Sequence, residues 1–429
     1  MPTVQTTDLD LQVYRKLNRR LLPFLGCLYI IAYIDRVNIG FAKLTMAQQL
    51  GFSDSIYGLG AGIFFIGYFL FEIPSNLILH RVGAKVWIAR IMIIWGLLAC
   101  AMVFVSTPMQ FYILRFLLGV GEAGFFPGII LYLTYWYPAP RRAKATATFM
   151  ASVALAGVIG SPLSGFIMTS LDGVSTLTGW QWLFLIEALP ALILGIMVAL
   201  WLENGPAQAR WLSLAERNWL TSKLTAESIN KQQSGHIICF NQALCNTKLW
   251  QLSFIYFSIV MGFYGISFWL PQLVNTLVDK NLMLTGLLSA IPYAVAAIGM
   301  IVIGHSSDKK NERCWHIALS ALTGSLGLLI SAIYINHLAL ALFGFSLASL
   351  GILSALAVFW SLPTAFLSGT AAAGGLALIN AFGNLAGYLS PVLVAWIKTQ
   401  TGDFTNALYM LASWLIVAAA IVLIKFRTL

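Results

Sequence analysis

Long apolar runs, separated by short polar segments, recur from near Leu21 almost to the end of the chain. The runs are continuous rather than alternating, so they predict helices and not strands. Lipid offers the backbone no hydrogen-bond partners, and a spanning helix needs about 20 mostly apolar residues. By this measure the pattern predicts twelve transmembrane helices, at residues 21–43, 56–78, 84–104, 108–137, 143–170, 180–202, 248–276, 284–304, 314–334, 338–361, 369–397 and 405–425.

The composition agrees with a chain embedded in a lipid bilayer. Hydrophobic residues make up 59% of the 429 residues and charged residues only 9%, whereas a soluble domain carries about a quarter charged residues. The net charge of +10 would suit a nucleic-acid binder, but the basic residues are dispersed and form no patch, so no nucleic acid is expected. The five cysteines and five histidines are scattered, and we expect no disulfide, metal or other cofactor.

The basic residues also predict the topology. With the N-terminus in the cytoplasm, 20 of the 25 Lys and Arg residues fall in cytoplasmic segments, and only Lys43, Lys280 and Lys398 fall outside. The remaining two, Arg36 and Arg115, lie within predicted spans. This asymmetry favours an even number of helices with both termini in the cytoplasm. No cleavable leader is evident, so the first apolar run is expected to be retained.

One long polar stretch divides the predicted helices into six and six. It predicts an N-terminal six-helix bundle at 1–202, a cytoplasmic linker at 203–247 with a short surface helix around Leu214–Leu224, and a C-terminal six-helix bundle at 248–429. Helices five and eleven, which occupy corresponding positions, share an Ala-Gly pair followed by Ser-Pro. The predicted fold is an all-α membrane protein of two pseudo-symmetric bundles, a layout typical of a carrier with two rocking halves.

Six charged side chains lie deep within the predicted spans, away from the span ends, and all six belong to the first half. A charge at mid-bilayer costs at least about 2.5–3.5 kcal/mol, so such groups are expected to pair with each other or to line a wet cavity. They are Asp35, Arg36, Glu72, Arg115, Glu122 and Glu187.

Three of these charges suit proton-coupled transport of an anion. Arg36 can hold a carboxylate through its planar donor fork. Asp35 and Glu122 lie near the middle of their helices, where a carboxyl can take up and release protons. The alternative is a static ion-pair network that only orients the helices, and the sequence leaves it open.

The other intramembrane polar residues have two interpretations each. Arg115 and Glu187 can form a structural pair or take part in function, and neither interpretation is favoured. Glu72 lies toward the cytoplasmic end of its helix, where a structural or gating role is favoured over a part in transport chemistry. Asn380 and Asn384 are one turn apart, deep in helix eleven. Their amides can bind substrate hydroxyls or form an interhelical hydrogen bond.

Several segments resemble a known family. The run Y-I-D-R-V-N-I-G-F-A at 33–42 is similar to the first-helix signature of the anion:cation symporter family within the major facilitator superfamily. The stretch 115–128, with G-E-A-G at 121–124, resembles the fourth helix of that family, and G-W-Q-W-L-F at 179–184 with Glu187 resembles its sixth. The resemblance covers nearly the whole chain and is looser in the second half.

This resemblance implies two six-helix bundles around a central cavity and proton symport of small organic anions. The substrates implied are sugar acids, tartrate, and phthalate-type or hydroxyphenylacetate-type acids. A monomer in the bacterial inner membrane, with lipid, the anion and protons as its partners, is the corresponding expectation. By similarity Asp35 and Glu122 would couple protons, and the residues facing the substrate would be Arg36, Tyr33, Tyr68, Trp360 and Asn380, with Asn384 one turn further.

One loop departs from the superfamily pattern G-x-x-x-D-R-x-G. The stretch 76–83 reads N-L-I-L-H-R-V-G, whereas the second-half version keeps Gly304 and Asp308. The cytoplasmic gate of the first half is therefore expected to be held by other contacts or to be weaker. Asp308 is expected to pair with a helix end or a basic loop.

Other functions remain as alternatives. An anion exchanger or a sodium-coupled carrier would need the same carboxylate clamp. A membrane sensor or receptor would need a soluble signalling domain, and the linker 203–247 is too short to form one. A membrane enzyme would need a nucleophile–base pair or a metal cluster, which the sequence does not contain.

Overall fold

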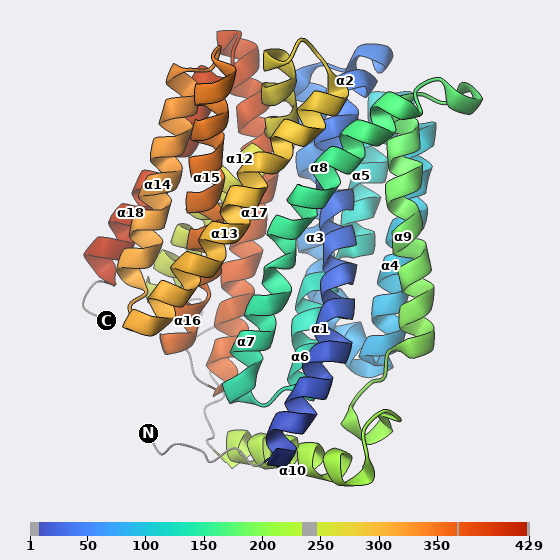
Figure 1. Ribbon diagram of the computed structural model, residues 1–429, viewed down its shortest axis with the longest axis vertical. Coiled ribbons are helices and arrows are strands. Elements are labelled where there is room, and N and C mark those ends of the chain that lie inside the picture. Colours follow the sequence, from blue (N-terminus) through green and yellow to red (C-terminus); the bar gives the residue numbers. More distant parts are fainter. Residues whose placement is uncertain (1–7, 234–246, 367–368, 427–429) are drawn as a thin grey trace.

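The computed structural model describes residues 8–233, 247–366 and 369–426. Within these residues the chain is a bundle of long helices without strands, and twelve segments are long and apolar enough to cross a membrane (Figure 1). The predicted all-α fold and helix count are confirmed. The first half contains α1 (Asp8–Val37) with α2 (Ile39–Leu50), α3 (Asp54–Val82), α4 (Ala84–Ala101), α5 (Pro108–Glu122) with α6 (Phe125–Trp136), α7 (Ala139–Met150) with α8 (Ser152–Ser170), and α9 (Gly179–Trp201).

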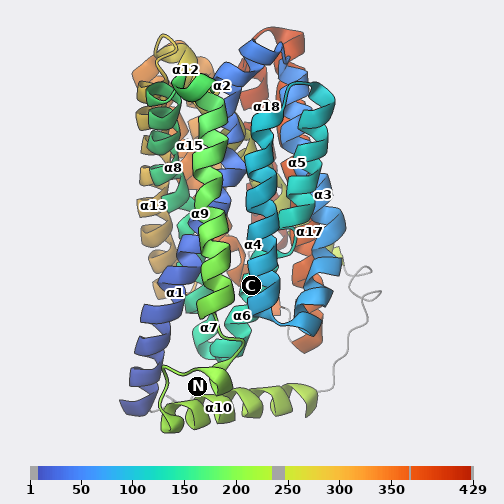
Figure 2. The same cartoon turned by 90° about the vertical axis from the view of Figure 1, so that its right-hand side faces the viewer.

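The second half repeats the arrangement with fewer interruptions. It contains α12 (Thr247–Leu277), α13 (Leu282–Lys310), α14 (Cys314–Ile333), α15 (Leu338–Phe359) with α16 (Ser361–Phe366), α17 (Gly369–Thr401) and α18 (Thr405–Lys425). Between the halves, α10 (Leu214–Gln233) lies across one end of the bundle (Figure 2). We call this end the α10 end and the opposite one the α2 end. The predicted surface helix is confirmed and is longer than expected.

The first helix begins earlier than the sequence pattern indicated. We expected it to begin at Leu21, but α1 begins at Asp8. Val13 and Leu17 are fully buried and lie one turn apart, on the face that continues into the apolar run. Arg15 and Lys16, which lie between them on the exposed face, obscured this apolar spacing in the sequence.

An ion pair ties this extension to the linker helix. Lys16 Nζ lies 2.7 Å from Glu216 Oε1 of α10. Burial of the Glu216 carboxyl favours its neutral form, but hydrogen bonds from Lys16 and from the backbone of Ser213 outweigh burial and lower its pKa. The Glu216 carboxylate therefore stays ionised near neutral pH, and its pairing with Lys16 fixes α10 against the α10 end of α1.

The two halves are joined by polar contacts at the α2 end. Lys43 contacts the side chains of Asp54 and, from the second half, Gln272. Lys398 Nζ of α17 lies 2.7 Å from the other Asp54 oxygen. Lys43 Nζ also lies 3.9 Å from the centre of the Trp269 ring. These contacts hold the halves together at this end.

Helix four, predicted as one element, is broken in its middle. α5 ends at Glu122, Ala123 adopts ψ 131°, and Gly124 has φ +84°. This positive φ favours glycine, which has no Cβ. The break frees the Ala123 carbonyl, which accepts a hydrogen bond from Ser75 Oγ of α3 at 2.7 Å. α3 therefore stabilises the break that directly follows Glu122.

A second glycine allows α3 and α5 to lie in close contact. A Cβ at Gly119 would lie 1.9 Å from the backbone oxygen of Phe64. The backbones of the two helices thus touch just before Glu122, as small residues permit in membrane bundles.

We predict that Gly119→Ala lowers stability by about 1–3 kcal/mol, because the added methyl must push α3 and α5 apart. The measurement is the thermal unfolding midpoint of the detergent-solubilised protein. Gly304→Ala on α13 is the matched control, since no atom lies within 4 Å of its added Cβ. Equal midpoints for the two variants would contradict the prediction.

We also predict that Ser75→Ala lowers stability by about 1–3 kcal/mol, because the Ala123 carbonyl then stays buried without this donor. The thermal midpoint again measures the effect. Ser413→Ala serves as control, because the exposed Ser413 hydroxyl donates to the Met410 carbonyl of its own helix. This hydrogen bond does not join two segments. A midpoint unchanged by Ser75→Ala would show that the break needs no support from α3.

Candidate functional site

The Arg36 side chain lies where the two halves meet. It is 8% exposed. Its Nη2 donates to the carboxylate of Glu122, the last residue of α5, and forms an ion pair with it. Its Nη1 donates to the hydroxyl of Tyr264 on α12 at 3.3 Å. The guanidinium therefore links a carboxylate of the first half to a phenol of the second.

Aromatic rings surround the same guanidinium. Arg36 Cζ lies 5.8 Å from the ring centre of Tyr33 and 5.4 Å from those of Phe64 and Tyr68. Ring faces attract cations, and they do so more strongly where water is excluded. Tyr33 and Tyr68, which the resemblance placed near the substrate, thus border the guanidinium from α1 and α3.

Asp35 has a different set of partners from Arg36. One carboxylate oxygen accepts a hydrogen bond from the indole N–H of Trp95 on α4, and the other accepts from Asn38 Nδ2 at 3.3 Å. Adjacent residues of a helix point about 100° apart, so Asp35 faces α4 while Arg36 faces α5 and α12. Only Arg36 and Glu122, of the three residues grouped from the sequence, are in direct contact.

Glu72 joins the halves through a second buried contact. Its two carboxylate oxygens accept hydrogen bonds from Asn380 Nδ2 at 2.7 Å and from Asn384 Nδ2 at 3.0 Å. Glu72 belongs to α3 and is 8% exposed, and both amides belong to α17. The interhelical hydrogen bond, which was one interpretation of these amides, is therefore observed. Their binding of a substrate remains a prediction.

The structure gives Arg115 and Glu187 separate partners, in place of the ion pair that the sequence allowed. Arg115 donates to the backbone carbonyls of Gly60 at 3.2 Å and Ala61 at 3.4 Å on α3. Glu187 Oε1 accepts from Ser164 Oγ of α8 at 2.7 Å. Each of these contacts joins neighbouring helices of the first half, as the structural interpretation expects.

Two other predicted residues lie outside these clusters. Trp360 packs edge-on against Tyr256 with ring centres 4.8 Å apart, at the junction of α15 and α16. Asp308 forms an ion pair with Arg313 at 2.6 Å, so its predicted pairing with a basic connection is confirmed. The Asp308 side chain is 73% exposed, and such surface pairs add little stability.

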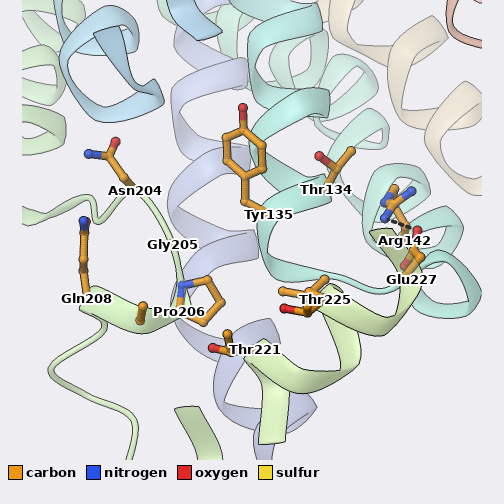
Figure 3. Close-up of a pocket in the computed structure, with 12 residues that line it drawn as sticks. Thr134, Tyr135, Arg142, Asn204, Gly205, Pro206, Gln208, Thr221, Thr225 and Glu227 are labelled. Carbon is orange, nitrogen blue, oxygen red and sulfur yellow. Dashed lines mark hydrogen bonds and ion pairs between the residues drawn. The ribbon is translucent and has the colours of Figure 1, made fainter. Parts of the chain in front are cut away.

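An open pocket of about 530 Å³ lies at the α10 end (Figure 3). It is bordered by α6, α7, the short turn Pro206–Gln208 and α10, and it is lined in part by Arg142 and Glu227, which form an ion pair at 3.0 Å. The residues that line it are Thr134, Tyr135, Arg142, Asn204, Gly205, Pro206, Ala207, Gln208, Thr221, Leu224, Thr225 and Glu227. They include none of the predicted site residues.

Trp95 and Ser164 were missed by the sequence interpretation. Each contributes one donor to a buried carboxylate from an otherwise apolar stretch of helix. Indoles and hydroxyls are common in membrane helices, so the sequence alone does not distinguish these two from residues that only pack.

Comparison with known proteins identifies the architecture. Residues 25–391 match the family model described as Major Facilitator Superfamily. An Agrobacterium vitis protein, provisionally named a tartrate transporter, is 46% identical over 425 residues, covering 99% of this chain and 94% of that protein. A quinolone resistance transporter of Acinetobacter baumannii is 40% identical over 405 residues, covering 94% and 93% of the two chains.

A solved structure shows the same fold at low sequence identity. A bacterial homologue of the human lysosomal transporter Spinster, in an inward-facing and occupied conformation, superposes with a TM-score of 0.76 at 18% identity, covering 97% of each chain. The family match spans most of the sequence, and two relatives exceed a third identity over nearly the full length. This chain therefore belongs to the Major Facilitator Superfamily and is a multi-pass membrane transporter.

Proposed function

We propose that this transporter takes up an organic carboxylate together with protons, by alternating access of one central site to the two sides of the membrane. The observation that carries the proposal is the Arg36 guanidinium, which is buried between the halves and paired with a carboxylate of the protein. A guanidinium that holds one carboxylate in this position can exchange it for the carboxylate of a substrate.

Proton uptake follows from that exchange. When the substrate takes the place of Glu122 on Arg36, the Glu122 carboxylate loses its cation in a buried position, at a cost of several kcal/mol. A proton on Glu122 removes the cost, and Asp35 on the neighbouring face of α1 is the second carboxyl proposed to accept one. With both acids neutral the halves can rock, and the substrate and protons leave on the other side.

The membrane orientation is part of the proposal. We place the α10 end in the cytoplasm, because the basic residues gather in the segments assigned to that side. A bacterial inner membrane and a monomer complete the proposal. A sugar acid, tartrate or an aromatic acid fits a carboxylate clamp, and the relative provisionally named for tartrate supports a hydroxy acid.

Two observations support rival functions. The relative named for quinolone resistance supports export of a drug-like molecule. The same buried contacts would also serve a static network within an anion exchanger or a sodium-coupled carrier. Sodium dependence of uptake would identify the sodium-coupled carrier, and uptake driven only by internal anion would identify the exchanger.

The proposal predicts that a pH gradient drives accumulation of a radiolabelled organic acid in proteoliposomes, and that Glu122→Gln strongly lowers this accumulation. Glutamine cannot exchange a proton, so the gradient does less work on each substrate molecule. Exchange of internal for external substrate is expected to persist in Glu122→Gln, because the amide still leaves Arg36 free for the substrate.

Glu187→Gln is the matched control for the loss of a buried acid. Its amide oxygen can still accept the Ser164 hydrogen bond, so gradient-driven accumulation should remain. Wild-type uptake that is indifferent to collapse of the pH gradient would overturn proton coupling. Full accumulation by Glu122→Gln would remove Glu122 from the proton path.

A further inference from the structure

Two donor sets at the interface of the halves are each occupied by a carboxylate of the protein itself. Arg36 holds Glu122, and the amides of Asn380 and Asn384 hold Glu72. In the second case both carboxylate oxygens receive an N–H, at 2.7 and 3.0 Å. A carboxylate only accepts hydrogen bonds, so each donor set is already arranged to bind one.

The two sites are neighbours. Arg36 Cζ lies 5.4 Å from the ring centre of Tyr68. Tyr68 precedes Glu72 by four residues on α3, so the two side chains lie on one face of that helix, one turn apart. Tyr68 therefore borders both sites, and a small molecule beside its ring would reach both donor sets.

We propose, building on the proton-coupled uptake above, that the substrate is a small dicarboxylate whose two carboxylates replace Glu122 on Arg36 and Glu72 on Asn380 and Asn384. Glu72 then acts as a placeholder that keeps the amides paired while the site is empty. A dicarboxylate in this position contacts α1 of the first half and α17 of the second, so its binding couples to their relative movement.

Displacement of Glu72 adds one proton to the transport cycle. The displaced carboxylate has lost both of its amide donors, and a buried carboxylate without donors is costly. A hydronium ion on the side from which the substrate enters transfers a proton to Glu72, so that an O–H bond of hydronium breaks, an O–H bond forms on the carboxyl and water is left. The new hydroxyl can donate to a neighbouring oxygen. When the substrate leaves, the O–H bond breaks, the proton is released on that side, and the carboxylate returns to the two amides.

The surrounding groups favour Glu72 and Glu122, rather than Asp35 and Glu187, as the carboxylates that a substrate displaces. Asp35 and Glu187 are bound to Trp95 and Ser164, which are neutral donors within the first half, away from α17. The charged or titratable groups that act on Glu72 are Arg36, Tyr68 and Tyr256, and those that act on Glu122 are Arg36, Arg115, Asp35, Tyr29, Tyr68 and Tyr264.

The first test compares matched acids on the wild-type protein in proteoliposomes. Tartrate and threonate differ only in one carboxylate, which is a hydroxymethyl group in threonate, and phthalate and benzoate form an aromatic pair. We expect the dicarboxylate of a transported pair to have a kcat/KM at least about tenfold higher, because each lost charged hydrogen bond weakens binding by roughly that factor. A monocarboxylate transported as well as its dicarboxylate partner would overturn the inference.

The second test counts protons. With the membrane potential clamped at zero, the logarithm of the dicarboxylate accumulation ratio rises with the pH difference, and the slope equals the number of protons per substrate. We expect Glu72→Gln to lower this slope by one, and the control Glu187→Gln to keep the wild-type slope. An unchanged slope in Glu72→Gln would show that Glu72 carries no proton in the cycle and only joins the halves.

The outcomes separate this inference from the proposed function. Wild-type uptake that ignores the pH gradient refutes proton coupling altogether. Proton-coupled uptake that lacks a preference for dicarboxylates leaves the proposed function standing and refutes only the placeholder role of Glu72.

Discussion

The contact between Arg36 and Glu122 is the interaction on which the rest of the site depends. Either charge alone, in a position as buried as this, would cost several kcal/mol, and the pair is tolerable because each ion satisfies the other. Tyr264 extends the pair into the second half. In the proposed cycle, a ligand that competes for Arg36 must therefore compensate Glu122, and this requirement is the proposed link between anion binding and protonation.

The two halves divide the chemistry unequally. Among the residues that the structure describes, the buried charged side chains come from the first half and from α10. At the central interface the second half contributes neutral groups, namely the phenol of Tyr264 and the amides of Asn380 and Asn384, whereas at the α2 end its Lys398 pairs with Asp54. The proposed proton carriers therefore all lie in the first half, and their partners from the second half are neutral. In the proposed cycle, movement of one half against the other changes which of these groups meet.

The sequence predicted the helices well because the bilayer imposes one simple rule, a continuous apolar run of sufficient length. It also predicted which residues are unusual, since a charge in such a run is costly wherever it lies. Partners were harder to predict. Glu72 and Asn380 are 308 positions apart, and the sequence around one gives no indication that the other is its partner. The start of α1 was missed because Val13 and Leu17 are buried by tertiary packing within a polar stretch.

The break after Glu122 places the ion pair at the junction of two helical segments, which a straight helix would not provide. α5, which carries Glu122, is packed backbone to backbone against α3 through Gly119. α6 begins beyond Gly124 and leads into α7 and toward α10. The Ala123 carbonyl is bonded to Ser75 rather than to its own helix, so a bend at this point breaks no helical hydrogen bond of that carbonyl. In the proposed cycle, a change of partner at Glu122 can therefore bend helix four at this joint, between the α3 contact and the α10 end.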